Sequence, residues 1–146
     1  MKILVLVCAL LLPASALAGP DRVSFLLGSE HFNATEDFQE FNPGVFLTWE
    51  RTFDYSIGVY YNSYEEVSPI VSVGYDFWEG DNWAIGAFAG LALYPGDGDR
   101  FEIAVGDVIL LGGLQARFGN VFAQLIPGNG QSTDGVLAVG LTFELD

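Results

Sequence analysis

Cysteine, histidine and basic residues are scarce in this sequence of 146 residues. It has one cysteine, Cys8, and one histidine, His31, and its 5 lysine and arginine residues face 19 aspartate and glutamate residues, for a formal net charge of −14. Nucleic-acid phosphates bind basic surfaces, so we expect no nucleic-acid partner. No spacing of histidine, cysteine or carboxylate residues matches a zinc or calcium motif, so we expect no metal site and no cofactor.

The N-terminal residues 1–18 have the features of a secretory signal peptide. One basic residue precedes an apolar run from Ile3 to Leu12, and the segment ends in small residues at Ala18. This pattern is typical of a cleaved export signal, and the apolar run is too short for a membrane-spanning helix. We therefore expect cleavage to remove Cys8 and to leave one domain, residues 19–146, without disulfides.

After the predicted signal peptide, no window of the chain shows a helical period. Apolar residues instead alternate with small or polar residues, which is the period-2 pattern of half-buried strands. The pattern is clearest in Trp83–Tyr94, where aliphatic side chains share one face and small residues share the other. Eight segments show this alternation: Val23–Phe32, Gly44–Thr52, Tyr55–Tyr64, Ser68–Trp78, Trp83–Tyr94, Val108–Phe118, Val121–Ile126 and Gly135–Leu145.

The links between these segments alternate in length. Short turns with aromatic neighbours follow the second, fourth and sixth segments, whereas longer and mostly acidic connections follow the others. This alternation predicts an all-β fold, an eight-stranded antiparallel up-and-down transmembrane β-barrel of the bacterial outer membrane, which we expect to be a monomer. A soluble barrel with a ligand cup is the alternative, but its outer face would be polar. The aliphatic and aromatic face of Ser68–Trp78 favours the membrane barrel.

The second face of the predicted strands is rich in glycine and alanine. An eight-stranded barrel is too narrow for a water-filled pore, so this face encloses either a cavity or a packed core. A cavity of this kind would accept an acyl chain, with each buried methylene contributing about 0.8 kcal/mol. The small residues would alternatively fit tightly around a few aromatic side chains. The alternation leaves both interpretations open.

Polar groups gather at one end of the predicted barrel. His31 lies at the end of the first predicted strand, and Asn62 and Ser63 lie near the end of the third, so all three reach the same rim. A histidine beside a hydroxyl group is the minimum for general base catalysis or for activating a weak nucleophile. The alternative interpretation is that His31, as a lone histidine at a strand end, is a surface or interface residue. Alternation places Ser63 on the outward face unless a bulge or the strand end redirects it.

The order of these features resembles the PagP family of outer-membrane lipid A palmitoyltransferases. The resemblance extends from about Ser29 to the C-terminus. It depends on five groups of residues: His31 with Phe41-Asn42-Pro43-Gly44; Gly58-Val59-Tyr60 with Asn62-Ser63-Tyr64; Pro69-Ile70 with Gly74-Tyr75; Trp83 to Gly90; and Ile126-Pro127-Gly128. It implies an acyltransferase whose partners are a phospholipid and lipid A.

The resemblance also implies roles for single residues. His31 and Ser63 match the histidine and serine that the family requires, whereas Asn62 stands where the family has aspartate. An amide at that position lacks a charge to stabilise an imidazolium, but it can still orient a ring nitrogen or donate to a developing oxyanion. Gly74 matches a glycine at the floor of the acyl pocket, where its missing side chain sets the length of the accepted chain.

The remaining expectations concern the barrel wall. Gly86, Phe88 and Gly90 are expected to line the acyl pocket with Gly74. Pro127 lies near a family proline that weakens strand pairing for lateral access of lipid, since proline removes a ladder donor. The helix that precedes the family's barrel has no counterpart here. Two further hypotheses therefore stay open: a non-catalytic barrel that binds lipid or another surface molecule, and a hydrolase that releases the acyl group to water.

Overall fold

The protein is described here by a computed structural model that covers residues 18–130 and 132–146. The predicted signal peptide lies outside these described residues except for its last position. The bounds of the elements are β1 Arg22–Phe32, β2 Phe41–Trp49, β3 Asp54–Tyr61, β4 Val67–Gly80, β5 Trp83–Leu93, the 3₁₀ helix η2 Gly98–Arg100, β6 Ala104–Val105, β7 Val108–Phe118, β8 Val121–Pro127 and β9 Gly135–Glu144. Within the described ranges, no helix has the length and apolar character needed to cross a membrane.

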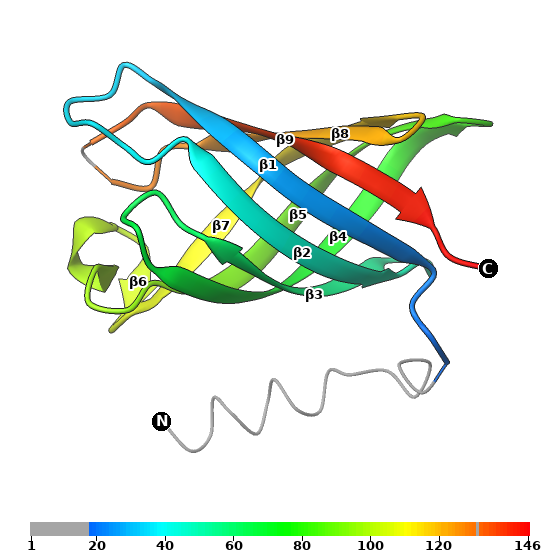
Figure 1. Cartoon of the computed structure of the whole chain (residues 1–146), viewed down its shortest axis with the longest axis horizontal. Helices are drawn as coiled ribbons and strands as arrows, with labels where there is room; N and C mark the ends of the chain where they lie inside the picture. Colours follow the sequence, from blue (N-terminus) through cyan, green and yellow to red (C-terminus); the bar gives the residue numbers. More distant parts are fainter. Residues whose placement is uncertain (1–17, 131) are drawn as a thin grey trace.

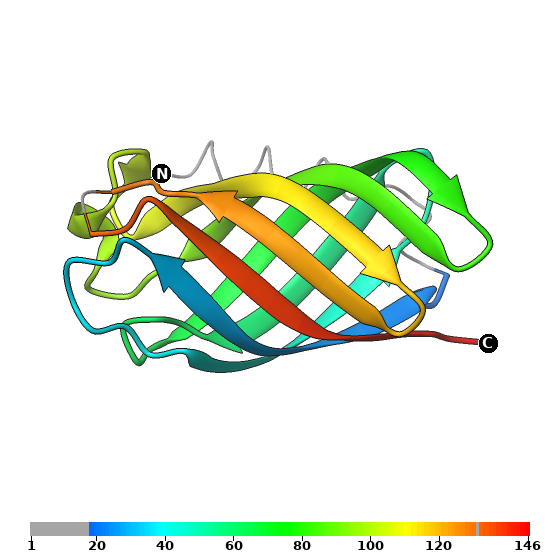
Figure 2. The ribbon, with the colours of Figure 1, turned by 90° about the horizontal axis from the view of Figure 1, so that it is seen from above.

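The strands form one antiparallel sheet that closes on itself. Each barrel strand pairs with its neighbours in sequence order, and the ring is completed by β9 with β1 and by β5 with β7. The two-residue β6 adds only to the edge of β7. In Figure 1, neighbouring strands run in opposite directions along the barrel. Figure 2 shows the same alternation of direction for β7, β8 and β9, which lie side by side. The predicted eight-stranded up-and-down barrel is confirmed.

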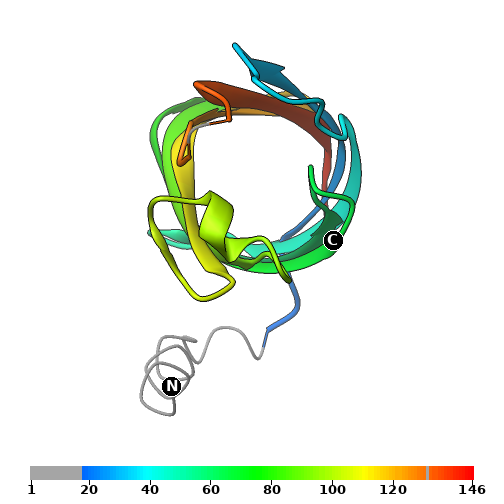
Figure 3. The ribbon, with the colours of Figure 1, turned by 90° about the vertical axis from the view of Figure 1, so that its left-hand side faces the viewer.

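The two ends of the barrel differ. The long connections gather at one end, here called the loop end, and the short turns lie at the opposite end, here called the turn end (Figure 1). In the end-on view of Figure 3, the connection between β5 and β7 lies over one side of the mouth. That connection contains η2 and β6. They were not predicted, because elements of three and two residues are too short to show a periodic pattern.

Apolar side chains cover the outside of the barrel. They come from every one of the eight barrel strands, as the alternation predicted. Exposed examples, taken from β1 through β9, are Phe25, Leu27, Val45, Ile57, Val59, Val71, Val73, Ile85, Leu91, Leu110, Leu114, Val121, Leu125, Val139 and Leu141. Exposed aromatic side chains lie beside the short turns at Phe53, Trp78, Trp83 and Phe118.

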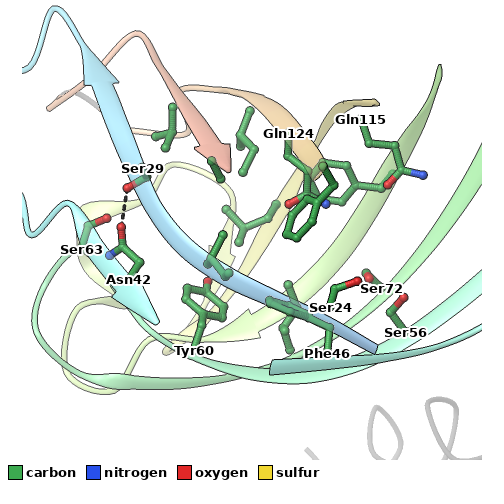
Figure 4. A pocket seen from close by; sticks show the side chains of 18 of the residues that line it. Ser24, Ser29, Asn42, Phe46, Ser56, Tyr60, Ser63, Ser72, Gln115 and Gln124 are labelled. Carbon is green, nitrogen blue, oxygen red and sulfur yellow. Dashed lines mark hydrogen bonds between the residues drawn. The ribbon is translucent and has the colours of Figure 1, made fainter. Parts of the chain in front are cut away.

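The inside of the barrel is polar toward the turn end. Arg22 is 6% exposed, and its guanidinium forms ion pairs with Glu50 at 2.6 Å and Glu144 at 2.9 Å. Figure 4 shows further polar side chains, Gln115 and Gln124, in the same half of the lumen. Arg22 is retained inside because its charge is paired, and the Gln115 amide donates to Asp76 Oδ1 at 3.2 Å. The sequence analysis, which relied on the glycine and alanine residues of the inward face, did not predict this polar half.

The middle of the lumen is apolar. Its lining includes large side chains from five strands: Leu26, Phe46, Ile70, Phe88 and Leu111. Ala138 belongs to the same buried apolar cluster as Leu26 and Ile70. The lumen therefore has an apolar section between the polar turn end and the loop end, where the predicted site lies.

Candidate functional site

The structure brings His31 and Ser63 together. Ser63 Oγ lies 3.0 Å from His31 Nε2, which is a hydrogen-bond distance. The two residues belong to β1 and to the β3–β4 connection, with β2 between them in the sheet. However, β2 begins only at Phe41, and its ladder with β1 ends at Gly28. No strand therefore separates the two side chains at the level where they meet.

A tight turn aims Ser63 at the histidine. β3 ends at Tyr61, three residues before the predicted end. Asn62 N then donates to Glu66 O at 2.8 Å, Glu65 N donates to Asn62 O at 3.1 Å, and Glu65 has a φ of 65°. Because the strand has ended, the alternation that would have placed Ser63 outside no longer applies.

Asn62 shapes this turn from inside. It is fully buried, its Oδ1 accepts hydrogen bonds from Tyr64 N at 2.8 Å and Glu66 N at 3.1 Å, and its Nδ2 donates to Ser68 Oγ at 2.9 Å. Among the described residues, none of its hydrogen bonds reaches His31. The geometry therefore corrects the predicted role: Asn62 positions Ser63 through the turn and does not orient the imidazole.

Phe38 completes the surroundings of the histidine. Its ring stacks on the imidazole, with centroids 4.2 Å apart and an interplanar angle of 14°. The edge-to-face partner of Phe38 is Tyr64, at 5.6 Å. Next to Phe38, Gln39 N donates to Ser63 O at 3.1 Å, so this connection is attached to the serine backbone. Phe38 was missed at the sequence level, where its only signal was an aromatic residue inside an acidic connection.

Aromatic side chains pack beside the pair at the loop end. Tyr60 and Tyr94 are buried, and the Tyr60 hydroxyl donates to the Tyr94 hydroxyl at 3.0 Å. Burial raises the pKa of Tyr94 to about 12. Phe101 lies edge-on to Tyr94 at 4.9 Å, and the Arg100 guanidinium lies 4.7 Å from the centre of the Tyr64 ring. The β5–β7 connection is thereby packed against the mouth of the barrel.

A cavity of about 220 Å³ extends from the pair into the lumen. His31, Ser63 and Phe38 line it at the loop end, and Phe88 lines its apolar section. Figure 4 shows Ser63 on one side of this space and Gln115 toward the other. A hydroxyl and an imidazole therefore stand at the mouth of a cavity with an apolar middle.

Gly74 lies where the apolar section meets the polar half. It pairs with Phe88 in the β4–β5 ladder and lines the cavity. A Cβ atom at this position would come within 2.9 Å of the Gln115 side-chain nitrogen, and that amide donates to Asp76 Oδ1 at 3.2 Å. Gly74 thus marks the boundary of the apolar section on the side of the turn end.

Gly86 and Gly90 do not line the cavity, although they share the inward face with Phe88. A Cβ atom at Gly86 would collide with the Tyr75 carbonyl oxygen, and one at Gly90 would lie 2.8 Å from Ser72 Cβ. Glycine is needed at these positions because β4 approaches closely. The prediction that they line the acyl pocket with Gly74 and Phe88 is therefore corrected.

Pro127 ends β8 at an interruption in the barrel wall. Its pairing with β9 continues to Gly135, but the ladder between β7 and β8 ends at Leu114 with Leu125. Residues 108–113 of β7 have no ladder partner in β8. We call the gap between these residues of β7 and the end of β8 at Pro127 the seam. Pro127 is exposed and also lines the cavity.

Comparisons with known proteins do not assign the chain to a family. No protein-family model matches the sequence, and no curated protein matches it. In residues 18–130 and 132–146, no three histidine, cysteine, aspartate or glutamate side chains gather as metal ligands.

Proposed function

We propose that this protein is an outer-membrane acyltransferase that moves a fatty acyl chain from a phospholipid to lipid A or a related lipid. The observation that carries the proposal is the hydrogen bond between His31 and Ser63 at the mouth of a partly apolar cavity. The resemblance of the sequence to the PagP family supports the same reaction.

The outer surface supports a bilayer as the surroundings. A closed barrel pairs the backbone polar groups of its strands within the wall, which is what a hydrocarbon environment requires, and the ring of strands here is closed apart from the interruption between β7 and β8. Exposed apolar side chains on all eight barrel strands would face the acyl chains of the membrane, and the exposed aromatic residues at the turn end would lie at an interface. The acidic long connections would then project on the outer side, where lipid A is found.

The reaction is an acyl transfer between two oxygens. The acceptor hydroxyl attacks the ester carbonyl of the phospholipid, a new ester forms, and the original bond between the acyl carbon and the glycerol oxygen breaks. The acceptor proton ends on the departing glycerol oxygen, so the products are an acylated acceptor and a lysophospholipid. His31 and Ser63 polarise the acceptor hydroxyl or the ester.

The apolar section of the lumen would hold the acyl chain. Contact with side chains such as Phe88 and Leu111 would contribute about 0.8 kcal/mol for each methylene buried. Gly74 would set how deep the chain reaches, because the polar side chains begin there. The seam at Pro127 would let the chain pass from the bilayer into the lumen, since few ladder bonds have to open.

Mass spectrometry of lipid A tests the proposal. Cells that express the protein should contain lipid A with one additional acyl chain, and His31→Ala and Ser63→Ala should abolish that species. Ser72→Ala is the matched control, because Ser72 lines the same cavity but does not bond to His31. An unchanged lipid A profile with the unmodified protein, in cells and in a defined phospholipid and lipid A mixture, would remove the acyltransferase assignment.

Substitution at Gly74 tests the acyl pocket. Gly74→Ala and Gly74→Met should progressively shorten the transferred chain, because the added side chain occupies the floor of the apolar section and displaces Gln115. The chain length is read from the same mass spectra. Transfer of an unchanged chain by Gly74→Met would show that the acyl group lies elsewhere.

A non-catalytic lipid-binding barrel is the second candidate. It is favoured by one observation, namely that no carboxylate bonds to His31 Nδ1 among the described residues. Lipid that copurifies with the protein without turnover would support this candidate. Free fatty acid in the defined mixture would instead support the hydrolase.

A further inference from the structure

The two nitrogens of the His31 ring have different surroundings. Nε2 lies 3.0 Å from Ser63 Oγ. Nδ1 is buried and has no hydrogen-bond partner among residues 18–130 and 132–146. A neutral imidazole carries one proton, so the burial of Nδ1 bears on which nitrogen holds it.

A proton on Nδ1 would create a buried N–H donor without an acceptor. With the proton on Nε2, the N–H group donates to Ser63 Oγ, and only a lone pair on Nδ1 is left unsatisfied. Buried donors without partners are rarer in proteins than under-used acceptors. Protonation of both nitrogens would place a charged donor in the same buried position. The surroundings therefore favour the neutral ring with its proton on Nε2.

No acceptor at Nδ1 fixes the ring from its far side, so another contact must fix it. That contact is Phe38, whose ring lies almost parallel to the imidazole at 4.2 Å. Phe38 is itself held by the edge-to-face contact with Tyr64 and by the adjacent bond from Gln39 N to Ser63 O. The stacked ring restricts imidazole rotation and covers one face of it.

We propose that Phe38 is a positioning residue that holds His31 as a hydrogen-bond donor to Ser63, which turns the Ser63 hydroxyl proton toward the lumen. The chemical consequence rests on the proposed acyl transfer. Ser63 then donates to the carbonyl oxygen of the phospholipid ester and stabilises the negative charge that develops there. The acceptor oxygen bonds directly to the acyl carbon, and the glycerol oxygen leaves. The proton of the acceptor hydroxyl ends on the departing glycerol oxygen. Ser63 and His31 keep their own protons, and no acyl-serine forms.

Nitrogen NMR of the imidazole tests the tautomer. His31 is the only histidine in the sequence, so the ¹⁵N-histidine-labelled protein in detergent micelles gives one unambiguous ring. Long-range couplings to the ring protons distinguish the two nitrogens, and we expect Nε2 to be protonated and Nδ1 to be bare at neutral pH. A proton on Nδ1 would overturn the proposal, because it would require a carboxylate partner at that nitrogen. Glu40 would be the candidate partner, since its charge acts on His31.

Substitutions at Phe38 test the positioning role. Phe38→Leu should average the two tautomers in the NMR spectrum, and Phe38→Tyr should restore the single tautomer because it keeps the flat ring. Phe101→Leu is the matched control: Phe101 contacts Tyr64 and Tyr94 and is expected to leave the His31 spectrum unchanged. An unchanged tautomer in Phe38→Leu would contradict the proposal whether or not the protein transfers acyl chains.

Kinetics and intact-protein mass spectrometry test the chemical consequence. In the acyl-transfer assay, Phe38→Leu should lower kcat by about 10- to 100-fold with little change in KM, and Phe38→Tyr should recover most of the activity. No acyl mass should accumulate on the protein during turnover. An acyl adduct on Ser63 would overturn the donor role while leaving the acyltransferase assignment intact. Absence of transfer with the expected tautomer would remove the assignment and leave the positioning role of Phe38 standing.

Discussion

Asn62 illustrates how one side chain can determine the geometry of a site without a hydrogen bond to the side chains of His31 and Ser63. Its amide makes three hydrogen bonds in the turn that carries Ser63, and it is fully buried. The position therefore couples the stability of the turn to the distance between Ser63 and His31. A variant at Asn62 should affect stability and activity together.

Asn62→Ala should lower the free energy of unfolding by roughly 3 kcal/mol, because it removes the donor to the Ser68 hydroxyl and the acceptor of two backbone N–H groups. Asn62→Asp should cost less, since a carboxylate oxygen accepts from the same N–H groups. Urea unfolding of the two variants in lipid vesicles measures the difference. Equal stability of Asn62→Ala and the unmodified protein would contradict the role assigned to the amide.

Tyr94 provides a pH-dependent prediction at the same scale. Burial raises the pKa of Tyr94 to about 12, above the value near 10 of an unfolded tyrosine. The neutral phenol is therefore the form that the folded state favours. Its contribution to stability is complete below about pH 10 and is lost as the pH rises through about 12.

Phenolate absorbance of the unmodified protein and of Tyr94→Phe measures this titration. The difference between the two curves should show one tyrosine that ionises near pH 12 in the folded protein and near pH 10 in denaturant. Ionisation near pH 10 in the folded protein would show that Tyr94 is solvated.

At the scale of the elements, the β7–β8 pair has the shortest ladder among the barrel strands. The ladder joins residues 114–118 of β7 to β8 but is absent from residues 108–113. β6 pairs with Val108 and Ile109 of this interval, and Leu110 N donates to Ile103 O. Asn129 bridges the same region, because its Nδ2 donates to Ile103 O and to Leu110 O. A side-chain bridge of this kind opens more easily than a continuous ladder.

Hydrogen exchange should therefore differ along β7. Amide groups in residues 111–113, which pair with β5 alone, should exchange faster than those in residues 114–118, which pair with β5 and β8, because local opening at the seam breaks fewer hydrogen bonds. Mass spectrometry of exchanged peptides in detergent micelles resolves the two halves, and the fully paired β4–β5 hairpin is the internal control. Uniform protection along β7 would show that the seam is closed and would weaken its proposed role in lipid access.

At the scale of the whole molecule, the distribution of polarity is inverted relative to a water-soluble protein. The outside is apolar over all eight barrel strands, whereas Arg22, Asp76 and Arg117 line the inside. Charge is otherwise concentrated in the connections, where most of the acidic residues lie. This distribution matches a barrel whose middle is surrounded by hydrocarbon.

Val71→Arg tests these surroundings. Val71 is 47% exposed and pairs with Ile57 and Leu91, which also point outward, so an arginine there would lie in the apolar belt. In lipid vesicles, the free energy of unfolding should fall by about 2–4 kcal/mol. Asp99→Arg, at an exposed position of η2, is the control and should have little effect. A Val71→Arg variant as stable as the control would indicate that this face is in water.

The sequence alone determined the number of barrel strands, which faces point outward and which links are long. These properties are local, because alternation with period 2 assigns a side chain such as Val71 or Phe88 to one face wherever the strand lies. It also indicated that His31 and Ser63 reach the same rim, since strand direction follows from the count of turns.

Only the tertiary structure decided which groups meet. The contact between His31 and Ser63 depends on where β2 begins and on how Asn62 turns the chain, and the stacking of Phe38 depends on a connection without periodicity. The polar half of the lumen, where Arg22 pairs with Glu144, arises from residues more than a hundred positions apart. Such contacts follow from the closure and register of the barrel, which no local pattern specifies.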